Sequence, residues 1–533
     1  MVAGTVPIAI ELGAGCAPLA RLQRLEVFVE RLAGEVDDML ARLGLPGRAV
    51  VSVVESDSSR ALRIRVRGVL QPYPAGQLRR MWHVLAPIEL HELAEEQGAH
   101  ADAWFSEYVA GLADGFEHPD WTLAFELVQR VVRETLWERA GSLVGIDQAD
   151  ALLRGATLAA NPPIEPSAMF EVLRGLVDLA VPVVARDRLI RTLERCAREG
   201  LSLEDTFEEA LAALRPKRIE VLADAETLGA LTGGGRLGAS TSVHDPRVDP
   251  ATRAEFLALE QALLLGRGVR LPGLELVPTT KLRAGMAAVR VNGRSSAFAL
   301  DDRRPALDAL MPRLAEELGR RAHLLVDVQE TGCRLGQLQE LFPSLVEAQI
   351  ARLSLADLTR ILRGLLREDL SIHDLKTICE LLLEFDTVPA DPQRYVVLDD
   401  RLPLAYRQGR GREDWRARLE FVRRGLAYQL SAAHSRGGRL DAIVVEPAAA
   451  SGGHDGLGEA EQEALRDAVW SQLDLLRGVS TRPVVYAAGG GRWAIRELLA
   501  PEFPALPVLA AAEVRHGIEV CEIGRIRLPA PAP

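Results

Sequence analysis

Two glycine-rich turns hold the residues best suited to binding a phosphate group. Gly13-Ala14-Gly15 follows an alternating apolar stretch, Pro7 to Leu12, which predicts a strand. A dinucleotide fingerprint needs a third glycine where Pro18 stands, so we interpret the segment as a tight turn. Gly489-Gly490-Gly491 also links a predicted strand to a predicted helix. No Lys-Ser or Lys-Thr follows it, which excludes a nucleotide P-loop and leaves a plain turn or an anion site.

The histidines, cysteines and serines form no catalytic or metal-binding pattern. His91-Glu92 is followed by Glu95 where a zinc protease needs its second histidine. No G-x-S-x-G elbow is present, and the ten histidines are dispersed. The cysteines are also scattered without a CxxC motif, which is typical of a reducing compartment; they are Cys16, Cys196, Cys333, Cys379 and Cys521. We therefore expect no catalytic residue, no metal ligand and no cofactor, and a non-enzymatic protein.

Length and charge narrow the class further. A chain of 533 residues predicts two to four domains. Its net charge of −12 argues against a general nucleic-acid coat or an anionic membrane surface as partner. No run approaches the roughly 18 apolar residues of a membrane span, and the N-terminus has no signal-peptide pattern. We expect a cytoplasmic protein that does not insert into a membrane.

The stretch from Leu353 to Ile378 organises the chain. Leucines at helical spacing predict two amphipathic helices joined by a tight turn. Each helix is preceded by an S-x-x-D capping box, Ser354 with Asp357 and Ser371 with Asp374. The serine oxygen would accept a free N–H of the first turn, and the carboxylate would face the positive end of the helix.

An internal repeat accompanies this helix pair. Leu189 to Asp205 aligns with Leu358 to Asp374 at a constant offset of 169 residues, with eight identities. The repeat preserves a capping box, Ser202 with Asp205. Identities at one offset predict two copies of one structural unit.

A second pattern also occurs twice. Leu45-Pro46-Gly47 returns as Leu271-Pro272-Gly273, and Arg65-Val66-Arg67-Gly68, inside a strand predicted over Ala61 to Leu70, returns as Arg290-Val291-Asn292-Gly293. The spacings then differ, which predicts an insert of about 71–119 in the first copy. The insert is rich in aromatic residues, among them Trp82, Trp104, Phe105 and Tyr108. These residues would form either a small satellite core or an exposed docking patch.

The last hundred residues alternate predicted strands and helices, which favours a mainly parallel sheet. The fold class we predict is α/β and α+β multidomain, with two repeated α+β modules, each with a capped helix pair, and a C-terminal α/β sheet domain. The predicted domains are 1–215, 216–435 and 436–533.

Three motifs resemble the cytoplasmic domain of the FHIPEP family, the export-gate proteins of flagellar and type III secretion systems. Leu353 to Ile378 is similar to the family's helix-pair segment. Pro504-Ala505-Leu506-Pro507-Val508-Leu509, with Glu513, Ile518 and Gly524 after it, is similar to its C-terminal segment. Glu11 to Leu19 resembles the start of the family's cytoplasmic domain. The family's membrane domain has no counterpart here, and the cytoplasmic module looks duplicated.

The resemblance implies a docking platform that binds export chaperones, secreted cargo or proteins of the ATPase complex, and that forms a homo-oligomeric ring. It also implies a peripheral position at the inner-membrane export apparatus. In the family, chaperone complexes dock in a groove beside the inserted subdomain. We therefore expect Trp82, Trp104, Phe105 and Tyr108 to bind partners, with some of them partly exposed beside the Arg65–Leu70 strand.

Two other classes remain open at this point. Two capped helices with a short turn also describe a helix-turn-helix DNA-binding regulator, with Arg360, Arg363 and Arg367 supplying positive charge. The second helix carries Asp374 and Glu380, which does not suit a DNA-facing helix. An α/β enzyme that uses the C-terminal sheet is the other alternative.

Overall fold

The computed structural model describes most of the chain. The described residues are 4–22, 25–58, 60–74, 76–86, 90, 103–113, 121–154, 164–179, 181–201, 203–214, 219–232, 240–280, 282, 285–291, 294–301, 303–387, 415–446, 459–476, 482–488 and 491–527. Contacts within the chain define two compact units. Unit 1 comprises 1–5, 37–48 and 136–384, and unit 2 comprises 6–36, 49–135 and 385–533.

Unit 1 is built around a five-stranded sheet with the strand order β6-β7-β5-β8-β9. Its strands are β5 (Ile219–Ala223), β6 (Thr241–Ser242), β7 (Leu274–Pro278), β8 (Met286–Val291) and β9 (Arg294–Ala299). β5 pairs with β7 in parallel and with β8 antiparallel. Alternate residues of β5 and β7, such as Val221 and Leu276, are fully buried, which is why these segments form strands with one face in a core.

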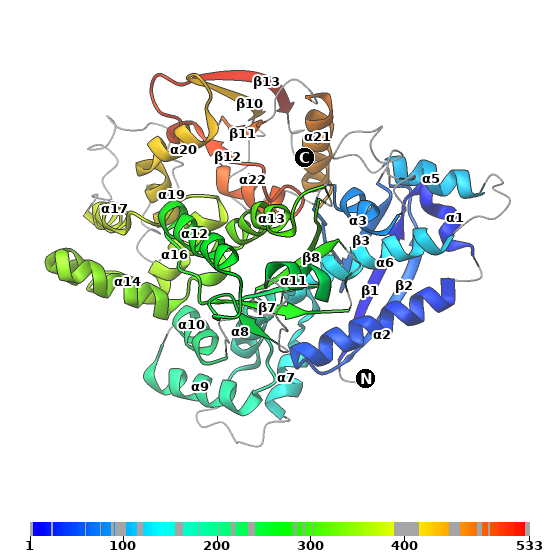
Figure 1. The fold of residues 1–533 in the computed structure, drawn as a ribbon, viewed down its shortest axis with the longest axis horizontal. Helices are drawn as coiled ribbons and strands as arrows, with labels where there is room; N and C mark the ends of the chain where they lie inside the picture. The colour runs from blue at the N-terminus through cyan, green and yellow to red at the C-terminus, as the bar shows by residue number, and fades with distance from the viewer. Residues whose placement is uncertain are drawn as a thin grey trace, which may run out of the picture. The chain divides into compact units, whose positions relative to one another are not determined.

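Helices make up the rest of unit 1 (Figure 1). Before the sheet come α7 (Ile146–Arg154), α8 (Pro166–Asp178), α9 (Arg186–Glu199) and α10 (Leu203–Leu214). Within and after it come α11 (Ala225–Leu231), α12 (Pro250–Arg267), α13 (Ala306–Arg320), α14 (Val328–Leu341), α15 (Pro343–Ile350), α16 (Leu355–Arg367) and α17 (Leu375–Thr387). Short 3₁₀ turns cover Ala140–Leu143 and Ala322–Leu325.

Unit 2 contains a four-stranded sheet with the order β2-β1-β3-β4. Its elements are β1 (Thr5–Leu12), a 3₁₀ turn (Ala14–Cys16), α1 (Ala17–Ala20), α2 (Leu25–Leu43), β2 (Arg48–Glu55), β3 (Leu62–Val66), β4 (Val69–Leu70), α3 (Gln77–Leu85), α5 (Ala103–Ala113) and α6 (Trp121–Glu138). α2 runs on into unit 1. Phe28 of α2 and Phe125 of α6 contact each other at a tilt, with ring centroids 5.0 Å apart, so both helices contribute to one apolar layer.

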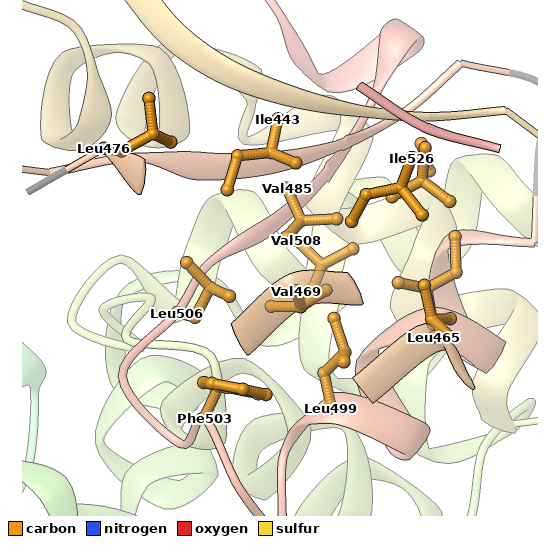
Figure 2. Packing of buried hydrophobic residues seen from close by; sticks show 13 residues of the cluster. Ile443, Leu465, Val469, Leu476, Val485, Leu499, Phe503, Leu506, Val508 and Ile526 are labelled. Carbon is orange, nitrogen blue, oxygen red and sulfur yellow. The ribbon is translucent and has the colours of Figure 1, made fainter. Parts of the chain in front are cut away.

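Unit 2 also contains a fully parallel sheet with the order β12-β11-β10-β13. Its elements are α19 (Trp415–Gly425), α20 (Ala427–His434), β10 (Arg439–Glu446), α21 (Glu459–Leu475), β11 (Val484–Ala487), α22 (Arg492–Leu499), β12 (Val508–Ala510), a 3₁₀ turn (Ala511–Glu513) and β13 (Glu519–Arg527). Figure 2 shows its core, in which Val485 and Val508 of the sheet meet Leu465, Val469 and Leu499 of the helices. The predicted parallel sheet is confirmed, and so is the mixed α/β class.

The strand predicted over Ala61 to Leu70 is wrong in one respect. It is a hairpin, because Arg67 and Gly68 take positive φ angles of 53° and 81° and turn β3 back into β4. Two consecutive residues of positive φ are the requirement of a two-residue hairpin turn whose twist matches the strands. The alternation of side chains continues through the turn in the sequence, so the pattern alone does not reveal it.

The two predicted copies share the hairpin and one ion pair. Arg65 lies 2.6 Å from Glu11, and Arg290 lies 2.7 Å from Glu220. The registers differ, because Glu220 is directly opposite Arg290 whereas Arg65 is opposite Ala9. A shift of two residues keeps both glutamates on the same face of their sheets. A duplicated module would have such shared features. The duplication itself remains a prediction.

Unit 1 groups α7 to α10 with the sheet that contains β5. This grouping of contacts cuts across the predicted boundary near residue 215. The predicted domains 1–215, 216–435 and 436–533 remain a prediction about how the chain is divided.

Candidate partner-binding site

The helix pair predicted within Leu353 to Ile378 is formed by α16 and α17. Ser354 is the N-cap of α16, and its hydroxyl accepts a 3.1 Å hydrogen bond from the backbone N–H of Asp357. The same hydroxyl donates to the Asp357 carboxylate at 3.0 Å. Leu358, Leu362 and Leu365 are at most 1% exposed, so the apolar face is core. Ser354 and Asp357 thus have a structural role.

The capping box predicted at Ser371 is wrong. The second helix begins at Leu375, and Asp374 accepts hydrogen bonds from the backbone N–H and hydroxyl of Thr377, at 3.0 Å and 2.7 Å. Ser371 instead accepts from the N–H of His373, two residues on. Aspartate is as good an N-cap as serine, so the cap lies three residues beyond the position that the S-x-x-D pattern predicts. In the first predicted copy, Asp205 lies in α10, and Ser202 lies outside the described residues.

Two of the three arginines predicted to supply charge for DNA binding, Arg360 and Arg363, pair with carboxylates of the protein itself. Arg363 is 6% exposed, and its guanidinium donates to both carboxylate oxygens of Glu208, at 2.5 Å and 3.1 Å. Arg360 lies 3.9 Å from Asp357. A recognition helix needs arginines that reach the nucleic acid, so the geometry does not favour the DNA-binding alternative.

The predicted partner-binding aromatics come together in one cluster of unit 2. Trp82 of α3 lies with its ring centroid 5.2 Å from Trp104 and 4.8 Å from Tyr108, both of α5. Phe105 follows at 5.7 Å from Trp104. The indole N–H of Trp82 donates to the carbonyl oxygen of Leu90 at 2.8 Å. Tilted and edge-on contacts at these distances are the favourable geometries for aromatic pairs.

Burial separates the four aromatic residues. Trp82 and Phe105 are fully buried and Trp104 is 2% exposed, so these three form a core. Tyr108 is half-buried and is the member that reaches the surface. Of the two interpretations of the insert, the satellite core describes three of its four residues. The accessible apolar group at the start of the insert is Val69 of β4, which is 64% exposed. A partner-binding role for these residues remains a prediction.

Close packing explains the first glycine-rich turn. A Cβ on Gly13 would lie 1.9 Å from the backbone oxygen of Arg60, and one on Gly15 would lie 2.5 Å from the Cβ of Ser106. Cys16 contacts the Ser106 hydroxyl at 3.7 Å, which places α5 directly on the turn. These glycines allow the backbone to approach its neighbours, as the tight-turn interpretation required.

An ion-pair cluster in unit 2 connects β3 and the residues just before it with α21 and the segment after α22. The guanidinium of Arg60 lies 2.7 Å from Asp467 and 2.9 Å from Glu502, and Arg63 pairs with Glu463. Burial by itself would lower the pKa of Arg60, but the two carboxylates outweigh it and raise the pKa. Arg60 and Asp467 are 407 residues apart, so no local sequence signal could have paired them.

Two cavities in the described parts of the chain are too small for a cofactor. Each has a volume of about 10 Å³, which is room for a single water molecule. Among the described residues, no three histidine, cysteine or carboxylate side chains are arranged to hold a metal ion. Burial raises the pKa of the Cys379 thiol to about 12, so this cysteine is a poor nucleophile. No helix in the described ranges is long and apolar enough to span a bilayer.

Comparison with known proteins connects the chain to one family. The FHIPEP family model matches residues 260–519, which include α16, α17 and most of the parallel sheet. The flagellar biosynthesis protein FlhA of Bacillus subtilis (strain 168) is 28% identical over 228 residues, which are 40% of this chain and 30% of that protein. The match therefore spans less than a third of that relative's length.

Solved structures give a weaker likeness. The Chlamydia pneumoniae CdsV protein is 17% identical with a TM-score of 0.44, over 58% of this chain and 97% of CdsV. The nonameric EPEC SctV-C is 15% identical with a TM-score of 0.43, over 58% of this chain and 98% of SctV-C.

The resemblance inferred from the helix-pair and C-terminal motifs is therefore confirmed where the match lies, and residues 260–519 carry the sequence pattern of the FHIPEP family of export-gate proteins.

Proposed function

We propose that the chain is a non-enzymatic docking component of a type III protein export apparatus, which binds export chaperones, cargo or ATPase-complex proteins. The observation that carries the proposal is the FHIPEP match over residues 260–519. Within that span the capped helix pair and the parallel sheet have buried cores, so they form a scaffold on which partners can bind. The proposal includes a feature that the family resemblance implies, namely that identical copies of the chain form a ring beside the membrane-embedded gate.

The docking site proposed is the β4 edge of the first sheet of unit 2. β4 is the last strand in the order β2-β1-β3-β4, and the insert begins directly after it. Val69 exposes an apolar side chain there, and Tyr108 is the insert aromatic that reaches the surface. The buried Trp82 and Phe105 make the insert rigid, which reduces the entropy lost when a partner helix binds.

The test uses the full chain and chaperone–cargo complexes purified from the same host's export system. Val69→Arg should weaken binding by about tenfold or more, because a charge would enter the apolar contact. Val50→Arg is the matched control, since Val50 is a 53% exposed valine on β2, at the opposite edge of the same sheet. Equal weakening by both substitutions, or by neither, would reject the β4 edge. Failure of the full chain to bind any export component would reject the function.

A further inference from the structure

One edge of the unit-1 sheet is formed by β9, the last strand in the order β6-β7-β5-β8-β9. Among the described strands, β9 pairs with β8 alone, in an antiparallel ladder that extends from Arg294 to Ala299. The strand at the other edge of this sheet, β6, is two residues long, whereas β9 has six residues. An edge strand of that length can serve as a template for another strand.

The hydrogen bonds of the ladder show which backbone groups of β9 point away from β8. The N–H of Leu300 donates to the carbonyl oxygen of Gly285 at 2.8 Å, directly beyond the end of the two strands. In an antiparallel ladder such bonded pairs alternate with unbonded ones, so Phe298 and Ser296 also bond to β8. The N–H and C=O groups that point outward are those of the residues between them, namely Ser295, Ala297 and Ala299. Among the described residues, none bonds to these outward groups.

The sequence of β9 lacks the features that commonly prevent an edge strand from pairing. Those features are charged side chains, proline and a short strand. Ser295 to Ala299 contain no charged residue and no proline, and both end residues of this stretch are exposed. By contrast, the edge strand β13 of the parallel sheet carries four charges, on Glu519, Glu522, Arg525 and Arg527. The edge at β9 is therefore open to a further strand.

The apolar core is also incomplete at this edge. Ala223 of β5, Ala287 of β8 and Phe298 of β9 lie in one row across the sheet. Ala223 and Ala287 are fully buried, whereas Phe298 is half-buried. A strand added beside β9 would place a side chain next to the Phe298 ring, and an apolar side chain there would complete the row. The edge thus offers backbone hydrogen bonds together with an apolar contact.

We propose that the outward edge of β9 binds an extended, apolar segment of a partner protein, which adds to the unit-1 sheet as a further strand. Backbone hydrogen bonds supply the affinity, and the side chain that packs on Phe298 supplies the preference for an apolar segment. A second copy of the chain is a less suitable occupant, because two chains of net charge −12 repel each other. The site lies in unit 1 and takes a strand, so the inference is independent of the helix docking proposed at β4 in unit 2.

The probe is a labelled synthetic peptide of about nine residues in which valine and threonine alternate, with a lysine at each end. Fluorescence anisotropy with the full chain should show saturable binding in the micromolar range. A control peptide of the same charge, with proline at every second position, cannot add to a sheet and should not bind. Hydrogen–deuterium exchange resolved to single residues should show that the valine–threonine peptide protects the amides of Ser295, Ala297 and Ala299. The amides of Ser296 and Phe298 already bond to β8 and should change less.

Ala297→Pro removes the central outward N–H. That N–H is not part of the ladder with β8, so proline there leaves the ladder in place. We expect this variant to bind the peptide at least about tenfold more weakly. Ala297→Ser keeps the N–H and is the matched control, which should bind like the wild type. Circular dichroism shows whether both variants are folded, and the exchange measurement on the wild type tests the proposal without any substitution.

Several results would overturn the proposal. They are the absence of peptide binding, equal binding of the proline-containing peptide, equal binding by folded Ala297→Pro and Ala297→Ser, and protection that omits the three outward amides. Analytical ultracentrifugation tests for the other occupant. Dimers of the full chain that Ala297→Pro dissociates would also overturn the proposal, because the added strand would then come from a second copy.

Discussion

Arg363 of α16 and Glu208 of α10 form a two-pronged ion pair inside unit 1, although 155 residues separate them in the chain. Both are buried, and Arg363 also donates to the carbonyl oxygen of Val326 at 2.7 Å. The pair links the helix pair of the first predicted copy to that of the second. Its stability contribution depends on both partners being present, because either charge alone would be buried without compensation.

Removing one partner of this pair should lower the free energy of unfolding strongly, and removing both partners should lower it much less. We expect Arg363→Leu to destabilise the protein by about 3–5 kcal/mol, because the Glu208 carboxylate stays buried. The double variant Arg363→Leu/Glu208→Leu should recover most of that loss. Arg360→Leu is the control, since its pair with Asp357 is half-exposed, and it should cost about 1 kcal/mol or less. Urea unfolding of the wild type, the two single variants Arg363→Leu and Glu208→Leu, the double variant and the control gives the free energy of unfolding of each protein. If the losses of the two single variants simply add up in the double variant, the expected coupling between Arg363 and Glu208 is contradicted.

The serine and aspartate residues at the starts of the two helices should contribute unequally to the stability of the protein. Ser354→Ala and Asp374→Ala should each cost about 1 kcal/mol, because each removes the acceptor for a first-turn N–H. Ser371→Ala should cost less, because Ser371 lies outside the helix. Leu362→Ala, at a fully buried position, should cost about 2–5 kcal/mol. Denaturant midpoints provide the comparison, and a larger effect at Ser371 than at Asp374 would identify Ser371 as the cap after all.

Asp374 should make the stability of this helix depend on acid pH. Partial burial opposes its ionisation, but hydrogen bonds from Thr377 to the carboxylate outweigh that effect and lower the pKa of Asp374. A lowered folded-state pKa means that the stabilisation is fully present above the unfolded value of about 3.9 and is lost as pH falls through the folded value. The stability difference between the wild type and Asp374→Asn should therefore shrink only below about pH 4. A difference that persists at low pH would contradict this.

The two Leu-Pro-Gly motifs should respond differently to the same substitution. Gly47 has a φ of +130° and Gly273 a φ of +106°, so alanine is strained at both. At Gly273 a Cβ would have no neighbouring atom within 4 Å, and the cost should be the conformational one, about 1–3 kcal/mol. At Gly47 the Cβ would lie 2.1 Å from the oxygen of Gly4, so the loss should be larger. Thermal unfolding of the two variants measures the loss of stability in each. Equal losses at Gly47 and Gly273 would argue against the close contact between Gly47 and Gly4.

Thiol labelling should distinguish the cysteines by exposure. Cys333 is exposed and Cys521 half-buried, whereas Cys16, Cys196 and Cys379 are buried. We expect rapid reaction of the native protein with a thiol reagent at Cys333, slower reaction at Cys521, and reaction at the other three only after unfolding. Burial also raises the pKa of Cys196 and of Cys379. Mass spectrometry of the labelled peptides identifies the sites, and rapid native labelling of Cys379 would contradict its burial.

Local patterns in the sequence determined those helices and strands in which apolar side chains recur at a regular helical or strand spacing. The leucine spacing and Ser354 located α16, because a helix with an apolar face and a cap is specified within about four turns of chain. The alternation of strands and helices after residue 436 determined the parallel sheet. The family motifs were also readable, because they lie in single short segments.

Tertiary structure alone decided which side chains are buried and which are paired. Trp82 and Phe105 are residue types that also occur in exposed binding patches, but both are buried in a core. Local sequence could not show this, because burial depends on neighbours that are distant in sequence. The pairs Arg363 with Glu208 and Arg60 with Asp467 join positions 155 and 407 residues apart, and no local pattern carries that information. The contacts of Trp493 with Trp415 and Arg416 have the same origin, since they form only when α22 packs beside α19.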